Sequence, residues 1–210
     1  MISSTSIAIS DVRDILSCAL PKLRTKKVAQ PTAKLAAVLV IIYPKNGNPT
    51  ILLTKRSRTV EKHKGQVSFP GGAYENRDGN LLQTALRETR EELELNTKSL
   101  QIVGELDDVF TSRSNFIVTP YVAFAPDLSN LDPNITEVTK VIEAPINVLA
   151  NPGIYKEEIW NVKGVRSSIF FYSYFSYKIW GLTACILKQL LDLLSPKLGL
   201  LNGSHYIFNG

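Results

Sequence analysis

The sequence predicts an α/β protein in which a mixed β-sheet packs between helices. Three observations support this fold class: a strongly apolar run at residues 35–44, a helical pattern of apolar residues at 81–93, and an irregular alternation of strand-like and helix-like segments. A doubly wound parallel sheet would instead require regular alternation. The chain has 210 residues, 44% of them hydrophobic and 20% charged, which is typical of one globular domain.

The first predicted elements are a helix and a pair of strands. Apolar residues recur at helical spacing from Ser10 until Pro21. The Val- and Ile-rich run 35–43 and the apolar residues 50–54 predict two strands, because the prolines and glycine between them indicate a turn. A further short strand is expected at 65–69, where a Pro-Gly-Gly sequence then leads into a loop.

The remaining elements follow a less regular order. The helix at 81–93 has the clearest pattern in the chain, since good helix formers separate its apolar residues. Strand-like patterns occur at 100–106, 116–125 and 167–174. Apolar residues at helical spacing over 182–194 predict a last helix, and the Gly- and Asn-rich residues after it are expected to be loosely held.

Several classes of protein are disfavoured. Residues 169–187 form a long, largely apolar stretch, but Lys178 and several Ser and Tyr within it argue against a membrane span. The N-terminus lacks the basic residues and apolar core of a signal peptide. Cys18 and Cys185 lie far apart without a CxxC pair, so neither a zinc site nor a disulfide framework is indicated. We therefore expect a cytoplasmic protein without membrane contact.

The net charge of +5 favours anionic ligands. Much of the positive charge lies in two clusters, residues 22–27 and 55–64, and the second stands just before the glycines at 71–72. Glycines let the backbone approach a phosphate closely. No repeated pattern of aromatic and basic residues is present, so nucleic acid is not an expected partner.

The helix at 81–93 carries three acids on one side. With ~100° per residue, Glu88, Glu91 and Glu92 fall within an arc of roughly 100°. Like charges at i,i+3 and i,i+4 repel, and a divalent cation would offset that repulsion with hard oxygen ligands. The alternative is a solvent-facing helix in which Arg87 pairs with Glu91 and Arg90 with Glu94.

The segment from Gly72 to Leu95 resembles the Nudix box. It runs Gly-x5-Asp-x8-Arg-Glu-Thr-Arg-Glu-Glu-Leu-Glu-Leu, whereas the usual form is Gly-x5-Glu-x7-Arg-Glu-U-x-Glu-Glu-x-Gly-U, with U a bulky apolar residue. The sequence departs from this form at four points: Asp78 for Glu, one extra residue before Arg87, Thr89 at an apolar position, and Glu94 for Gly.

A second motif resembles the coenzyme A pyrophosphatase branch of the same family. It comprises Leu52-Leu53-Thr54-Lys55-Arg56-Ser57, then Gly65 and Phe69-Pro70-Gly71-Gly72, with Glu61 in place of a common Arg. The likeness extends over residues 35–190. It implies a Nudix-type α/β/α sandwich with a mixed β-sheet between helices, divided as a helical extension at 1–30, the Nudix domain at 31–195 and a tail at 196–210.

The resemblance also implies roles for individual residues. Glu88, Glu91 and Glu92 would hold Mg²⁺ or Mn²⁺, and Arg87 would orient them by ion pairs. The general base would come from the box or from Glu137 in a later loop. Asp78 would be an auxiliary metal ligand or support the ligands. The candidates for substrate contact, on the 3′-phosphate or the diphosphate, are Arg56, Arg58, His63, Gly71 and Gly72, with Lys62 and Lys64 nearby.

The implied reaction is hydrolysis of the pyrophosphate bond of coenzyme A or a derivative, giving 3′,5′-ADP and 4′-phosphopantetheine or its acyl form. One alternative is a Nudix hydrolase of another nucleoside diphosphate derivative, such as NADH or ADP-ribose. Another is a non-catalytic Nudix domain that binds nucleotide, suggested by Glu94 and the basic charge. We expect a monomer or homodimer in the cytoplasm, because the chain ends Phe208-Asn209-Gly210 rather than in an SKL-type peroxisomal signal. A peroxisomal location is the alternative.

Overall fold

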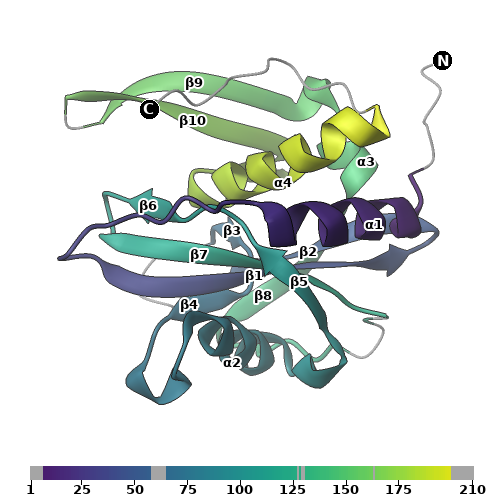
Figure 1. The fold of residues 1–210 in the computed structure, drawn as a ribbon, viewed down its shortest axis with the longest axis horizontal. Helices are drawn as coiled ribbons and strands as arrows, with labels where there is room; N and C mark the ends of the chain where they lie inside the picture. Colours follow the sequence, from purple (N-terminus) through teal and green to yellow (C-terminus); the bar gives the residue numbers. More distant parts are fainter. Residues whose placement is uncertain (1–6, 58–64, 127, 129–130, 163, 200–210) are drawn as a thin grey trace.

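A mixed eight-stranded sheet forms the centre of the molecule in the computed structural model, which describes residues 7–57, 65–126, 128, 131–162 and 164–199 (Figure 1). The main path is β3-β2-β1-β7-β5, with β4 paired to β1, β6 to β7 and β8 to β2. β1 and β7 are parallel, and the other pairs are antiparallel. The strands are β1 (Lys34–Lys45), β2 (Asn48–Arg56), β3 (Val67–Ser68), β4 (Gly71–Ala73), β5 (Gln101–Glu105), β6 (Val109–Thr111), β7 (Phe116–Phe124) and β8 (Val138–Pro145).

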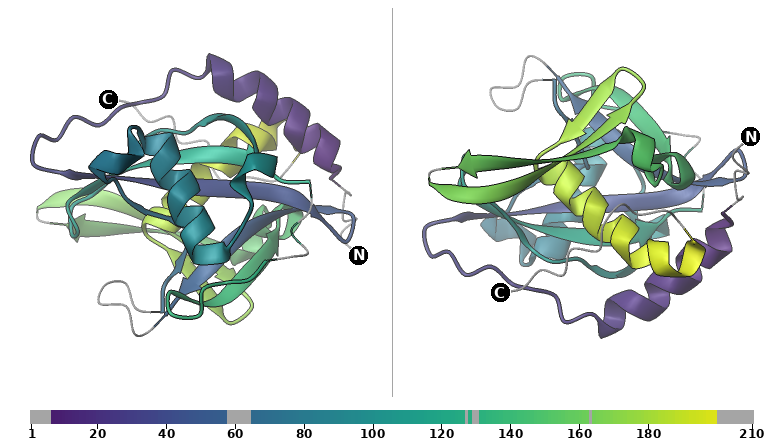
Figure 2. Two further views of the ribbon diagram at one scale, coloured as in Figure 1. Left: turned by 90° about the horizontal axis from the view of Figure 1, so that it is seen from below. Right: turned by 90° about the horizontal axis from the view of Figure 1, so that it is seen from above.

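Helices cover both faces of this sheet. α2 (Leu81–Leu93) lies on one face, while α1 (Ile9–Ala19) and α4 (Leu182–Leu198) lie on the other, as Figures 1 and 2 show. The short helix α3 (Ile146–Leu149) follows β8. The predicted α/β/α arrangement with a mixed sheet is therefore confirmed.

A second sheet packs beyond α4 (Figure 1). It has three antiparallel strands in the order β11-β10-β9, with bounds β9 (Tyr155–Val162), β10 (Val165–Tyr174) and β11 (Tyr177–Trp180). Of these, only β10 is anticipated from its aromatic residues. β9 has acidic and amide side chains among its apolar ones, and β11 is four residues long, so neither has a clear strand pattern.

β1 divides the hydrophobic core into two layers. Val38, Val40 and Ile42 pack with α1 and α4, whereas Leu39 and Ile41 pack with α2. Successive side chains of a strand point to opposite faces, so a strand covered on both faces is apolar at every position. This burial accounts for the apolar residues 36–43, whereas Leu35 and Pro44 at the two ends of the run are exposed.

Most predicted elements are present, with differences at their ends. α1 begins at Ile9, with Ala8 rather than Ser10 at the N-cap. α4 continues through Pro196 to Leu198, because a proline in the last turn removes one hydrogen bond without ending the helix. Among the described residues, no helix is long and apolar enough to cross a membrane.

The two glycines after Pro70 lie in strand β4 rather than in the expected loop. β4 pairs with β1 through the register Val38↔Gly71 and Ala37↔Gly72. Gly71 has φ +148°, and an added Cβ would lie 2.6 Å from Val38 Cα. The absence of a side chain therefore allows the backbone of β4 to lie directly against β1, between that strand and α2.

We predict that Gly71→Ala lowers the free energy of unfolding by roughly 2–4 kcal/mol, because the methyl group would overlap main-chain atoms of β1. The matched control is Gly47→Ala, which has positive φ (+75°) and no atom within 4 Å of an added Cβ. The control is expected to cost about 1–2 kcal/mol, from its backbone conformation alone. Urea denaturation of the two variants measures the difference, and equal losses would contradict the steric explanation.

Candidate metal and diphosphate site

The local structure of α2 explains two departures from the usual motif. Thr89 is fully buried, and its hydroxyl donates to the Ala85 carbonyl at 2.7 Å, so a polar residue fits an apolar position. Glu94 caps the helix in the left-handed conformation (φ 50°, ψ 25°), with its N–H donating to the Arg90 carbonyl. Glycine is common at this cap because it adopts that conformation without strain. Glu94 therefore preserves the end of the helix.

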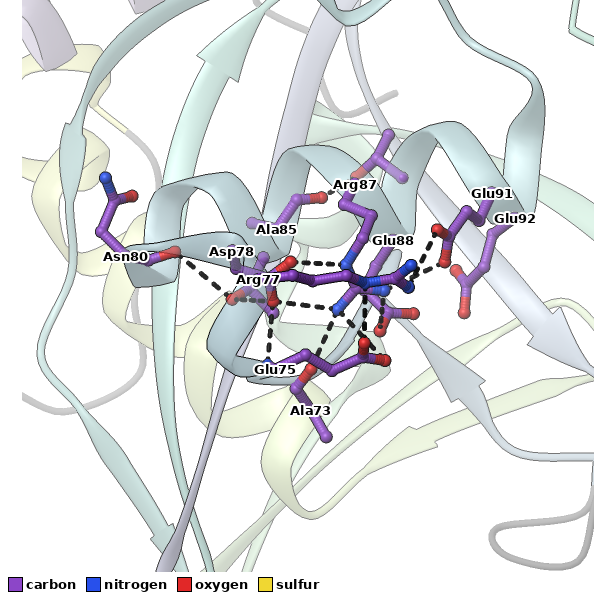
Figure 3. A network of polar contacts seen from close by, with 12 residues as sticks. Ala73, Glu75, Arg77, Asp78, Asn80, Ala85, Arg87, Glu88, Glu91 and Glu92 are labelled. Atoms are coloured by element: carbon purple, nitrogen blue, oxygen red, sulfur yellow. Dashed lines mark hydrogen bonds and ion pairs between the residues drawn. The ribbon is translucent and has the colours of Figure 1, made fainter.

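Arg87 is the centre of the polar network shown in Figure 3. Its guanidinium donates to Asp78 (2.7 and 3.1 Å), to the Ala73 carbonyl (3.1 Å), to Glu88 (2.8 Å) and to Glu91 (3.0 Å). The hydrogen bond that Arg87 donates to Asp78 is the main cause that raises the pKa of Arg87 above its usual value. One cation thus connects the turn after β4 with two acids of α2.

Asp78 supports Arg87 from the opposite side. Its carboxylate accepts from Arg87, from the Thr84 hydroxyl at 2.9 Å and from the Glu75 N–H at 2.9 Å. The Arg87 guanidinium holds the pKa of this carboxyl well below its usual range. Because these donors occupy both oxygens, the structure favours the supporting role of Asp78 over that of auxiliary metal ligand.

Glu92 occupies an unusual position for a carboxylate. The residue is 2% exposed, its Oε1 lies 3.4 Å from Arg56 Nη1, and its Oε2 has no hydrogen-bond partner. Burial raises the pKa of Glu92 to about 8; Arg56 opposes this shift, and the carboxylates of Glu88 and Glu137 add to it. The Nε atom of Arg56 is likewise buried without a partner. One atom of a cationic side chain and one atom of the neighbouring acidic side chain are therefore both buried without a hydrogen-bond partner.

Glu88 faces the same region. Glu88 is partly buried, and this burial is the main reason why its pKa is raised. The Arg87 guanidinium opposes the shift. A Cβ on Gly72 would overlap the Glu88 carboxylate, with its Oε1 at 2.5 Å. The missing side chain of Gly72 therefore provides the space that Glu88 fills.

Glu91 differs from the other two acids of the helix. It is exposed and pairs with Arg87 at 3.0 Å and with Arg77 at 3.8 Å. The Arg87–Glu91 pair predicted for a solvent-facing helix is thus present, but it belongs to a larger network. No interaction between Arg90 and Glu94 side chains is found among the described residues.

The loop before β8 brings Glu137 to the site. The Asn134 N–H donates to the Glu92 carbonyl at 2.9 Å, and the Glu137 carbonyl accepts from the Ser57 N–H at 2.7 Å. This loop therefore joins the end of α2 to the end of β2. The Glu137 carboxylate contributes to the raised pKa of both Glu88 and Glu92, which places it within electrostatic range of the two acids.

The chemistry of the acidic side chains near Glu92 suits a divalent cation, although their present positions do not surround one point. Glu88, Glu92 and Glu137 concentrate negative charge, and Glu92 keeps a buried oxygen without a partner. Hard oxygen ligands of this kind bind Mg²⁺ or Mn²⁺. In the arrangement seen here, the described part of the chain contains no group of three or more acidic, His or Cys side chains positioned to hold one ion.

The structure brings most of the predicted site residues together. Arg56, Gly71, Gly72, Arg87, Glu88, Glu92 and Glu137 surround one region between β2, β4 and α2, and Glu91 lies at its edge. Arg58, His63 and their neighbours Lys62 and Lys64 lie outside the described residues. Asn134 was not predicted, because its contacts, from its N–H to the Glu92 carbonyl and from its side-chain amide to the Glu137 carboxylate at 3.3 Å, depend on the fold of the loop.

Comparison with known proteins identifies the family of the chain. Residues 33–151 match the family model described as the NUDIX domain. The Nudix hydrolase NudL of Photorhabdus laumondii is 36% identical over 185 residues, covering 88% of this chain and 96% of that protein. The corresponding protein of Pectobacterium atrosepticum is 35% identical over 194 residues, covering 92% and 98%. The crystal structure of RenU, a Nudix hydrolase from M. smegmatis, matches with a TM-score of 0.47 and 21% identity over 56% of this chain and 74% of that chain. The family model and the two relatives show that the chain belongs to the Nudix family.

Proposed function

We propose that this Nudix hydrolase cleaves the pyrophosphate bond of coenzyme A or a derivative of it. Its membership of the family supports the broader statement that it acts on nucleoside diphosphate derivatives. The observation that carries the proposed chemistry is the buried Glu92 oxygen without a partner, beside Arg56 and two further acids. That arrangement combines a place for a cation with a guanidinium for an anionic substrate.

Nudix hydrolases generally use divalent metal ions. We assign Glu88, Glu91 and Glu92 as the residues that hold Mg²⁺ or Mn²⁺. When bound, such an ion neutralises charge on the diphosphate and makes a water molecule more acidic. Arg87 holds Glu88 and Glu91 in place through its contacts at 2.8 and 3.0 Å.

Arg56 is assigned to the diphosphate. Its guanidinium reaches Glu92 from the end of β2, and its Nε atom is buried without a partner. A guanidinium fork matches the spacing of phosphate oxygens. A diphosphate beside Glu92 would therefore give Arg56 the hydrogen-bond acceptor that it lacks.

Glu137 is assigned as the general base. Its negative charge raises the pKa of both Glu88 and Glu92. Its main chain is fixed by hydrogen bonds to Ser57 at 2.7 Å and to Asn134 at 3.0 Å. In the proposed reaction, Glu137 accepts a proton from the attacking water as the new phosphorus–oxygen bond forms. The bond between phosphorus and the bridging oxygen breaks, and that oxygen leaves as part of the second phosphate product.

The choice of coenzyme A rests on the upstream motif. Leu52 to Arg56 forms the second half of β2, and Ser57 follows it. Phe69 to Gly72 leads into β4, so the motif borders the site on two strands. The decisive experiment incubates the protein and Mg²⁺ or Mn²⁺ with coenzyme A, NADH and ADP-ribose and separates the products by chromatography. We expect 3′,5′-ADP to form from coenzyme A; turnover of NADH alone would contradict the assignment.

We predict that Glu88→Gln and Glu92→Gln each lower kcat by roughly 10²–10³-fold, as expected for loss of one electrostatic contact in the active site. The fold should survive, because Gln keeps the size of Glu and Glu92→Gln also removes a buried charge. Steady-state kinetics give the activity. In thermal melting with and without Mn²⁺, the wild type is expected to be stabilised and the two variants much less so.

The matched control for these variants is Glu94→Gln. Glu94 lies in the same motif, but it is exposed at the end of α2. It should keep both the activity and the stabilisation by Mn²⁺. If Glu92→Gln retained normal turnover at saturating metal, its assignment as a ligand would be wrong.

We predict that Glu137→Gln lowers kcat by roughly 10²–10⁴-fold while stabilisation by Mn²⁺ remains, since a general base is needed for proton transfer and not for holding the ion. Asp132→Asn is the control, because Asp132 is an exposed acid of the same loop. Kinetics and melting curves are measured on the same preparations. Loss of the Mn²⁺ effect in Glu137→Gln would identify this residue as a metal ligand instead.

A further inference from the structure

Two lysines and one tyrosine form a cluster at the end of β2 that the proposed reaction does not use. Lys55 Nζ lies 5.6 Å from the centre of the Tyr177 ring, and Lys140 Nζ lies 5.9 Å from it. Lys55 and Lys140 are directly opposite each other on the paired strands β2 and β8. Tyr177 begins β11, so both sheets contribute to the cluster.

This cluster lies on the other side of β2 from the acids of α2. Ile51 and Leu53 of β2 belong to the core layer with α4, and Leu52 belongs to the layer with α2. Continuing this alternation, Lys55 faces the second sheet and contacts Tyr177, whereas Arg56 faces α2 and contacts Glu92. Adjacent residues thus present a positive charge on each face at the end of one strand.

The described acids do not balance the charge of the cluster. Among the described residues, no carboxylate lies within 4.0 Å of Lys55 or Lys140, although salt bridges elsewhere are frequent. Like charges directly opposite each other on paired strands are unfavourable. The Tyr177 ring relieves part of this repulsion, and an anion between the two ammonium groups would relieve more.

We propose that Lys55, Lys140 and Tyr177 form a subsite for a phosphate monoester of the substrate, separate from the diphosphate beside Arg56. The inference rests on the proposed function, since coenzyme A carries a 3′-phosphate in addition to its diphosphate. Such a monoester has about −1.5 to −2 charges at neutral pH, which two lysines match. The Thr139 hydroxyl donates to the Lys55 carbonyl at 3.1 Å and fixes β2 against β8 at this point.

The test compares coenzyme A with dephospho-coenzyme A, which lacks only the 3′-phosphate. For Lys55→Met and Lys140→Met, we expect the ratio of kcat/KM on coenzyme A to kcat/KM on the dephospho form to fall roughly fivefold each, and roughly 25-fold in the double variant. Methionine keeps the apolar stem and removes the charge. Turnover of dephospho-coenzyme A should stay near that of the wild type.

Lys178→Met is the matched control. Lys178 is the next residue of β11, and its ammonium lies 4.5 Å from the centre of a different ring, that of Phe171. Its substrate ratio should not change. An equal loss on both substrates in the Lys55 and Lys140 variants would overturn the proposal, because the cluster would then serve the diphosphate or the fold.

A binding measurement separates this proposal from the proposed function. Calorimetry without turnover compares adenosine 3′,5′-bisphosphate with AMP; we expect the wild type to prefer the bisphosphate and the double variant to bind both equally. Wild-type protein that binds the bisphosphate selectively but does not cleave coenzyme A would refute the reaction and keep the subsite. Equal binding of the two nucleotides by the wild type would overturn the subsite. It would also be overturned if inorganic phosphate bound with the same affinity as the bisphosphate, because the cluster would then be a site for free phosphate.

Discussion

The ion pair between Arg87 and Asp78 determines where the acids of α2 lie. Asp78 belongs to the turn after β4, and its oxygens also accept from Thr84 and from the Glu75 main chain. The guanidinium is therefore held on one side before it meets Glu88 and Glu91 on the other. A bidentate arginine whose side chain is only 10% exposed has little freedom, so it transmits the position of the turn to both carboxylates. The extra residue before Arg87 is accommodated because the shorter Asp78 still reaches the guanidinium.

The buried carboxylate of Glu92 lowers the stability of the fold. A carboxylate that is 2% exposed loses most of its hydration, and the arginine contact at 3.4 Å and the Gly71 main chain compensate for only part of that loss. Glu88 and Glu137 increase the cost by repulsion, as the pKa of about 8 for Glu92 reflects. A purely structural helix would place an apolar residue there. The retention of an ionisable carboxyl group there points to a requirement of the chemistry rather than of packing.

Sequence patterns predict the elements whose burial is simple. Residues 36–43 are apolar because β1 is covered on both faces there, and the helix at 81–93 has the bounds that its periodicity indicates. They do not predict β4, since two glycines usually mark a loop, and here they are needed for close contact with β1. Nor does helical geometry separate Glu91 from Glu92, because their environments depend on Arg87, Arg56 and a loop 40 or more residues away along the sequence.

In the proposed assignment, two neighbouring residues at the end of β2 have different roles, one in cleavage of the substrate and one in its selection. Arg56 and Lys55 are neighbours in sequence, yet the pleat of the strand directs one to Glu92 and the other to Tyr177. In the proposed assignment, the first contact concerns the bond that is broken and the second concerns which molecule is accepted. Because Lys55 and Tyr177 do not touch the acids of α2, the second task can change in evolution without moving the metal ligands. The three-stranded sheet, which holds Tyr177, then contributes to substrate selection while α2 and β4 keep the chemistry constant.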